Sequence, residues 1–346
     1  MKITEFDYKL PKELIAQKPI EPRDHSRLLV LDRKNNTIEH RHFFEIGKYL
    51  KKGDVLVCNQ SEVISAKISG YKIIDNKKSA KLDLLLLNSN NKGLWEFLVK
   101  PIKRIKVGSE ILIEKDDHKL KAIVEEILED GIALLRFKES DETVLNFFDK
   151  YGDIPLPPYI QNQKIKRSQY QTIYAKRLGS VAAPTAGFHF TNDLIKKLKR
   201  KGIQFVFVTL HVGLGTFQPV RNDKIENHKM HSEKFELNKD NAEILNKARK
   251  NKQRIIPVGT TSVRVLESSF KNDKFISQTI ETDIFIYPGY QFKTVDAMIT
   301  NFHLPKSTLL MLVSAFTGKE LIDKAYLEAI KEKYRFYSFG DAMLIL

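Results

Sequence analysis

Residues 191–212, TNDLIKKLKRKGIQFVFVTLHV, contain two different hydrophobic patterns within one short stretch. Apolar residues recur at helical spacing among charged ones over 191–200, which predicts an amphipathic helix. Gly202 ends this helix, and the apolar run at 204–212 predicts a buried strand. A helix that leads directly into a buried strand is typical of α/β proteins.

The same alternation continues on both sides of this stretch. We expect strands at 27–32, 54–59, 254–260 and 283–289, and helices at 11–16, 43–50, 241–250, 307–316 and 323–333. This order favours an α/β sheet or barrel with helices packed outside it. The expected fold is a large, barrel-like α/β domain.

Residues 61–150 have a different pattern, since short apolar strands there are separated by polar turns such as Asp130-Gly131. Several short strands at this spacing predict an antiparallel barrel or sandwich. A helix is expected at 141–150. We therefore expect a large α/β catalytic domain made of 1–60 and 151–346, interrupted by a small antiparallel β-barrel insertion domain at 61–150.

The charge is unevenly distributed along the 346 residues, whose net charge is +15. Residues 61–150 hold 16 basic and 16 acidic residues, so all of the excess lies in the expected large domain. A polyanionic partner such as nucleic acid would explain the excess, and so would a lysine-rich proteome. The stretch 161–201 has ten basic residues and one acidic residue, Asp193. It is either the solvated face of a helix or a phosphate-binding segment, for which the candidates are Lys164, Lys166, Arg167, Lys176 and Arg177.

The compartment is expected to be the cytoplasm, without a membrane anchor. Cys58 is the single cysteine, so no intramolecular disulfide forms. The first 17 residues have no apolar core of the signal-peptide kind, and the apolar run 309–316 is too short to cross a bilayer.

Six segments combine polar residues with turns at the ends of apolar runs, where α/β folds bind their ligands. They are 23–29 (RDHSRLL), 179–191 (GSVAAPTAGFHFT), 209–220 (TLHVGLGTFQPV), 228–233 (HKMHSE), 258–267 (VGTTSVRVLE) and 299–316 (ITNFHLPKSTLLMLVSAF). Each also has a structural interpretation. Arg23 and Arg27 either clamp an anion or pair with Asp24, and Thr260 and Thr261 either bind a ligand or cap a helix. The backbone amides of 179–191 either receive an anion or base edge, or Thr191 is only a helix N-cap.

Two known motifs match this sequence only in part. Gly213 and Gly215 resemble half of a dinucleotide-binding fingerprint, but the third glycine is missing and Pro219 blocks the required helix. His228, His231 and Glu233 offer zinc ligands, but they lack the i, i+4 histidine pair of helical zinc proteases. Acid–base chemistry by His231 or Glu233 is the preferred interpretation.

Together with FDYKLPKELIAQKPIEPRDHSRLLVL near the N-terminus and YRFYSFGDAMLIL at the C-terminus, these segments in this order resemble the S-adenosylmethionine:tRNA ribosyltransferase-isomerase family of queuosine biosynthesis. The resemblance covers nearly the whole chain. Lys67 and Phe188 stand where the family usually has arginine and leucine, and the run Lys164, Lys166, Arg167 is basic where relatives often carry acids.

The resemblance implies a reaction and its partners. The ribosyl part of S-adenosylmethionine, a co-substrate, would be transferred to 7-aminomethyl-7-deazaguanine at the tRNA wobble position and isomerised to epoxyqueuosine, with release of adenine and methionine. The protein is expected to be a monomer and to need no metal. A plain RNA-binding protein, a methyltransferase and a zinc hydrolase are the alternatives.

The candidate residues are assigned to three roles. Acid–base catalysis is expected from His211, His231, Glu233 and His303. Substrate binding is expected from Arg23, Asp24, Arg27, Thr185, His189, Thr260, Thr261, Arg264 and Asn301. Binding of tRNA phosphates is expected from the five basic residues at 164–177 named above.

Overall fold

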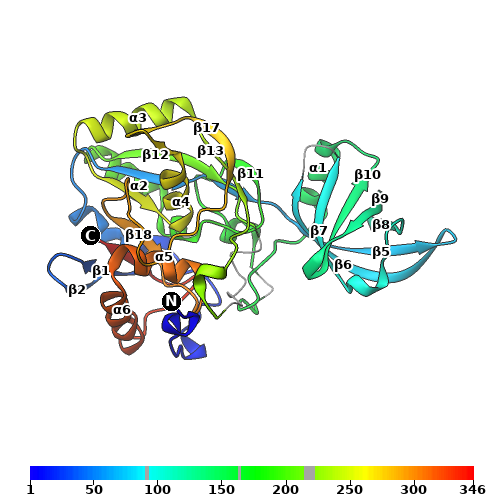
Figure 1. Cartoon of the computed structure of the whole chain (residues 1–346), viewed down its shortest axis with the longest axis horizontal. Coiled ribbons are helices and arrows are strands. Elements are labelled where there is room, and N and C mark those ends of the chain that lie inside the picture. Colours follow the sequence, from blue (N-terminus) through cyan, green and yellow to red (C-terminus); the bar gives the residue numbers. More distant parts are fainter. Residues whose placement is uncertain (90–92, 163–164, 214–222) are drawn as a thin grey trace. The chain divides into compact units, whose positions relative to one another are not determined.

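The computed structural model describes residues 1–89, 93–162, 165–213 and 223–346 (Figure 1). Its Cα positions divide into two compact units. The larger unit contains Met1–Glu62, Pro157–Arg177 and Ala183–Leu346, and the smaller contains Val63–Leu156 and Leu178–Ala182. The expected boundaries lie after residues 60 and 150, and the return of 178–182 to the smaller unit is not among the expectations.

A nine-stranded mixed sheet runs through the larger unit. Its order is β17 (Gln278–Thr282), β13 (Glu233–Leu237), β12 (Gln204–Leu210), β3 (Val55–Asn59), β14 (Ile255–Val258), β18 (Met298–Asn301), β19 (Ala342–Ile345), β1 (Arg27–Asp32) and β2 (Thr37–His42). The α/β class is therefore confirmed. The barrel-like arrangement is wrong for this unit, because β17 and β2 are edge strands that do not pair with each other.

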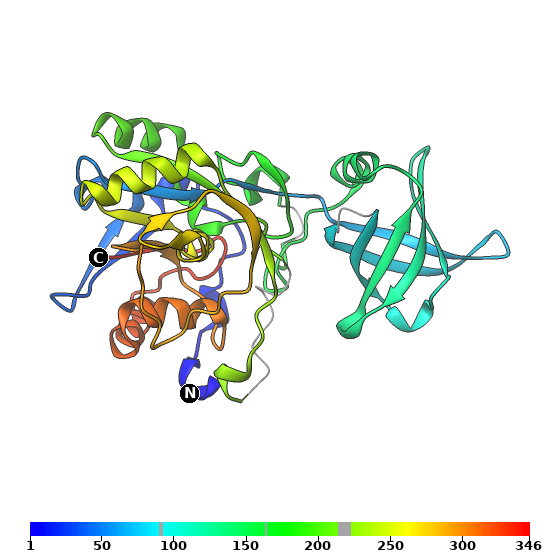
Figure 2. The ribbon, with the colours of Figure 1, turned by 45° about the horizontal axis from the view of Figure 1, so that its top comes forward.

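Helices cover both faces of this sheet (Figure 2). They are α2 (Asn192–Arg200), α3 (Lys239–Lys250), α4 (Thr260–Ser269), α5 (Thr308–Thr317) and α6 (Lys319–Lys331). Leu29 and Leu31 of β1 pack in the core formed with α5 and α6, whereas Leu28 and Val30 pack in the core formed with α2. Successive strand side chains point to opposite faces, and burial on both faces explains the continuous apolar runs.

Local signals position the helix expected at 191–200 well. The Thr191 hydroxyl accepts a hydrogen bond from the backbone N–H of Leu194, so Thr191 is the N-cap of α2.

The strand expected at 283–289 is wrong, because the edge strand β17 ends at Thr282. Residues 284–287 instead pack their apolar side chains against the core on the α5 and α6 side, where Ile286 is buried. The expected helices at 11–16 and 43–50 are 3-10 turns, η2 (Lys12–Leu14) and η4 (Phe43–Lys48).

The smaller unit contains six strands that close into a barrel. Around the barrel they are β10 (Ile132–Phe137), β7 (Leu94–Lys100), β6 (Lys77–Ser89), β5 (Lys67–Ile74), β8 (Glu110–Lys115) and β9 (His118–Ile127), followed in sequence by helix α1 (Asp141–Tyr151). All neighbouring strands are antiparallel, and Trp95, Phe97 and Phe148 fill the core. Outside these two sheets the described chain has two short strand pairs. β4 (Ser61–Val63) pairs with β11 (Arg177–Ser180), and β15 (Phe270–Lys271) pairs with β16 (Lys274–Phe275) in the larger unit.

Within the described ranges, no helix has both the length and the apolar character that a membrane span requires.

Candidate active site

The carboxyl ends of four neighbouring strands meet at one edge of the nine-stranded sheet. β12, β3, β14 and β18 are mutually parallel, so the residues that follow them emerge on the same side. β1 runs in the opposite direction to β18, with both strands paired to β19, and the start of β1 therefore reaches this edge as well. Open α/β sheets bind ligands at such an edge.

Asn59 joins three of these strand ends. Its side-chain amide donates to Leu210 O (3.0 Å) and to the Thr261 hydroxyl (3.3 Å), and its Oδ1 accepts from the Leu210 backbone N–H (3.1 Å). Gly259 is the N-cap of α4 with a φ of 89°, which favours glycine. Thr260 and Thr261 therefore occupy the first turn of α4 and do not cap it, which corrects the capping interpretation.

His189 lies between two polar side chains from distant segments. It belongs to the 3-10 turn η8 (Thr185–His189), its Nδ1 lies 2.7 Å from Ser26 Oγ, and its Nε2 lies 3.3 Å from Asn301 Oδ1. The Asn301 amide donates to Tyr337 O (2.9 Å), which leaves Oδ1 to face the imidazole. All three side chains are buried.

These contacts determine the tautomer of His189. Since a carbonyl oxygen only accepts, Nε2 carries the proton, and Nδ1 must accept the hydroxyl proton of Ser26. Burial lowers the pKa of His189 to about 3, so the ring is neutral near pH 7. The Ser26 hydroxyl therefore donates to His189 and keeps its lone pairs for other partners.

Ser26 and His189 line a pocket together with Arg23, Arg335, Phe188 and Phe339. The Arg23 guanidinium lies over the Phe188 ring (5.1 Å) and donates to Gln171 O (2.7 Å), Ser168 O (2.8 Å) and Gln169 O (3.0 Å). Those backbone carbonyls occupy both terminal nitrogens. The Arg335 guanidinium makes two longer contacts, a hydrogen bond to Lys18 O (3.5 Å) and an ion pair with Asp341 (3.4 Å), and is the less committed cation of the pocket.

Asp24 and Arg27 are engaged in contacts of the protein itself. Asp24 accepts a hydrogen bond from the Thr191 hydroxyl (2.8 Å). The Arg27 guanidinium lies over the ring of Tyr334 (3.8 Å) and donates to Glu332 O (2.5 Å). Among the described residues neither Arg23 nor Arg27 forms an ion pair with Asp24. Thr185 is half-buried at the start of η8.

Glu233 and Arg264 form a buried ion pair near another part of this edge. Glu233 Oε1 accepts from the backbone N–H of Gly213 (2.9 Å), and Oε2 accepts from Arg264 Nη1. Arg264 also donates to Thr282 O (3.2 Å). Each side chain is 5% exposed. The pair therefore connects β13, α4, β17 and the segment after β12, so its geometry favours positioning over acid–base chemistry.

The other three candidate catalytic residues do not gather around His189 through direct contacts. His303 is buried, its Nε2 lies 2.8 Å from Thr300 Oγ1, and its backbone oxygen accepts from the Tyr8 hydroxyl. Burial lowers the pKa of His303 to about 3 and that of His211 to about 4. His211 Nδ1 has no hydrogen-bond partner within the described part of the chain. His231 is exposed.

The basic candidates differ in how freely they face solvent. Lys166, Lys176 and Arg177 are exposed, whereas Arg167 pairs with Glu62 (3.1 Å). Lys164 lies outside the described residues. The segment is attached to the pocket by Arg23, which binds the backbone of 168–171.

In the ranges the structure describes, no three His, Cys, Asp or Glu side chains are placed to hold a metal ion. His228 instead packs edge-on against Phe285, with ring centroids 5.4 Å apart.

Buried neutral histidines predict that stability falls in acid. In the folded protein, His189 and His303 have pKa values near 3, below the ordinary 6.5. Below pH 6.5 the two histidines therefore bind protons in the unfolded chain but not in the folded one, which lowers the free energy of unfolding. For each histidine, no stability is lost above pH 6.5. The loss grows as the pH falls toward 3 and reaches up to about 2 kcal/mol in the free energy of unfolding at pH 5. Chemical denaturation at pH 7 and pH 5 measures this loss. His303→Gln should reduce it and the exposed His118→Gln should not; an unchanged loss in His303→Gln contradicts the explanation.

Sequence reasoning missed Ser26, Asn59 and Arg335 as site residues. Ser26 lies within RDHSRLL, where the charged residues dominate the pattern. Asn59 directly follows the apolar run of β3, and a polar residue at a strand end is the signal that identifies the other candidates. Arg335 belongs to YRFYSFGDAMLIL, a matching segment from which no candidate was chosen.

Comparisons with known proteins agree over the full length. A family model described as queuosine biosynthesis protein matches residues 3–345. The S-adenosylmethionine:tRNA ribosyltransferase-isomerase of Thermotoga petrophila is 51% identical over 346 residues, and that of Thermosipho africanus is 50% identical over 345 residues; both alignments cover 100% of each chain. A crystal structure of S-adenosylmethionine tRNA ribosyltransferase from Thermotoga maritima matches with a TM-score of 0.55 at 42% identity, covering 99% of this chain and 100% of that one. The chain therefore belongs to the queuosine biosynthesis protein family.

Proposed function

We propose that this protein is an S-adenosylmethionine:tRNA ribosyltransferase-isomerase. It transfers the ribosyl moiety of S-adenosylmethionine to 7-aminomethyl-7-deazaguanine at the tRNA wobble position and isomerises it to epoxyqueuosine, releasing adenine and methionine. The observation that carries the proposal is the 51% identity to a protein of that name over the whole of both chains.

The chemistry requires several groups from the protein. The donor sulfonium acidifies the neighbouring 5′ C–H, a base removes that proton, and an acid assists the departing adenine. The aminomethyl nitrogen attacks only in its neutral form, which desolvation favours. An acceptor facing the substrate can orient this N–H donor without protonating it.

Ser26 fits that role. Because its hydroxyl proton points to His189, the oxygen offers lone pairs to an N–H group of the substrate. His189 and Asn301 are then positioning residues, since they act through Ser26. Arg335 is the cation available in the same pocket for the methionine carboxylate.

The other expected roles remain parts of the proposal. His211 lies two residues before Gly213, whose backbone N–H binds Glu233, and His231 and His303 complete the candidate acids and bases. Thr260 and Thr261, in the first turn of α4, contact the donor nucleoside. Thr185 faces the modified base, and Lys166, Lys176 and Arg177 contact phosphates. We propose a cytoplasmic monomer without a metal. The smaller unit with its closed barrel is an inserted domain, and residues 61–150, which include that barrel, carry no excess charge for RNA.

One assay tests the reaction. The protein, dialysed against a chelator, is incubated with S-adenosylmethionine and tRNA that carries the aminomethyl base, and the products are separated by chromatography. Free adenine and methionine in equal amounts are expected. S-adenosylhomocysteine would indicate a methyltransferase, loss of activity on chelation would indicate a metal enzyme, and unchanged donor would leave RNA binding alone; each would overturn the proposal.

A further inference from the structure

Phe44 is the one exposed phenylalanine among the described residues, with 39% of its surface accessible. Its ring is nearly parallel to that of His42, with centroids 5.4 Å and planes 9° apart. The ring of His25 also contacts Phe44, with ring centroids 5.2 Å apart and an angle of 52° between the ring planes. Both histidines are exposed. We call His25, His42 and Phe44 the aromatic platform.

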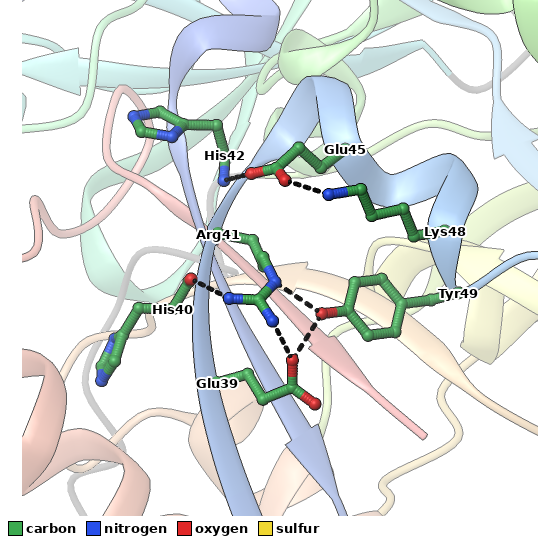
Figure 3. A network of polar contacts seen from close by, with 7 residues as sticks. All are labelled: Glu39, His40, Arg41, His42, Glu45, Lys48 and Tyr49. Carbon is green, nitrogen blue, oxygen red and sulfur yellow. Dashed lines mark hydrogen bonds and ion pairs between the residues drawn. The ribbon is translucent and has the colours of Figure 1, made fainter.

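The platform is supported by a network of polar contacts (Figure 3). Glu45 accepts from the backbone N–H of His42 (3.0 Å) and from Lys48 Nζ (2.7 Å), and so fixes the start of η4. The Tyr49 hydroxyl accepts from Arg41 Nε (3.0 Å) and donates to Glu39 (2.8 Å), which joins the end of η4 to β2. A rigid support presents Phe44 to solvent without further ordering of the chain on binding.

A groove with basic walls lies beside the platform, between η4 and α2. Its lining includes Phe44, Lys48, Lys197 and Lys201, with Glu45 as the single acidic residue. Glu45 is already paired with Lys48, and Lys197 has no ion-pair partner among the described residues. The groove therefore carries a positive charge excess.

The platform and the pocket of His189 are connected through neighbouring residues of the chain. Phe43, the residue before Phe44, packs its ring 5.0 Å from the His189 ring, and its backbone N–H donates to Ser26 O (2.8 Å). His25 precedes Ser26 directly, so one short segment contributes to both the pocket and the platform. Nucleotides bound beside the pocket would therefore lie next to a segment that also carries the platform.

We propose that the aromatic platform and the basic groove hold the anticodon loop of the tRNA, with a base stacked on Phe44 and phosphates near Lys48 and Lys197. This inference rests on the proposed function. Exposed aromatic rings beside basic residues are the chemistry that binds single-stranded nucleic acid, because every base has a face that stacks and every phosphate is an anion.

The test uses an RNA hairpin with the sequence of an anticodon arm, and fluorescence anisotropy over a range of salt concentrations. Phe44→Ala and Phe44→Leu should both weaken binding about tenfold, whereas Phe44→Trp should restore it. Lys197→Ala should weaken binding and reduce the salt slope by about one, while the exposed Lys324→Ala on α6 should change neither.

The outcomes separate the two proposals. If the wild-type protein releases adenine and binds the hairpin, but Phe44→Ala and Lys197→Ala bind it as tightly, the platform is not the RNA surface and this inference fails alone. If Phe44→Leu binds like wild type, apolar bulk and not stacking is what matters, and the inference also fails. If the wild-type protein neither binds the hairpin nor releases adenine, the proposed function itself fails.

Discussion

His189→Ala is expected to lower kcat by about a hundredfold, while the affinity for tRNA and the fold are retained. Burial lowers the pKa of the imidazole to about 3, which makes it a weak base, and its Nδ1 lone pair already accepts from Ser26, so it is not the group expected to take a proton from the substrate at pH 7. Its effect is to hold the Ser26 hydroxyl in one orientation (2.7 Å). Removing a preorganised hydrogen-bonding group from an active site costs roughly 10²–10³ in kcat.

The mechanism predicts a particular pattern among variants. Ser26→Ala should be as slow as His189→Ala, and the double variant no slower than the slower single variant, because both changes remove one unit. Steady-state kinetics with adenine release as the readout measure this, with His118→Ala in the smaller unit as the control. Additive losses would show that the two residues act separately. A limb in the pH–rate profile between pH 5 and 8 that disappears in His189→Ala would contradict its neutral state.

Local sequence signals predict local structure here and leave the pairing of distant segments open. α2, its N-cap Thr191 and β12 follow from residues within one turn or one strand of each other. Whether the strands close into a barrel depends on long-range register, which periodicity does not contain. That is why the open nine-stranded sheet differs from the barrel-like expectation, and why 284–287 is apolar without being a strand.

The site shows the same limit at the level of single residues. His189 and Asn301 were both candidates, yet they are 112 positions apart, and Ser26 is 163 positions from His189. Residue type indicates that a buried polar group needs a partner, but it does not say which one. Glu233 and Arg264 were assigned to different roles for this reason, and the fold makes them one pair.

Glu233→Gln is expected to lower the free energy of unfolding by about 3–5 kcal/mol, the largest effect on stability that the structure predicts. The substitution keeps the volume and the hydrogen bond from Gly213 but leaves the Arg264 guanidinium buried without its counter-charge. A buried charge without a partner costs more than the pair gained, because its hydration is lost and nothing replaces it.

The comparison with an exposed pair makes the test specific. Asp323 pairs with Lys319 four residues earlier on the surface of α6, and Asp323→Asn should cost less than about 1 kcal/mol because water solvates both charges. Urea denaturation followed by circular dichroism measures both variants. The double variant Glu233→Gln/Arg264→Met should recover part of the lost stability, since it removes the uncompensated charge. A Glu233→Gln protein as stable as wild type would show that the buried charge of Arg264 is compensated without Glu233, and would contradict the structural role assigned to the pair.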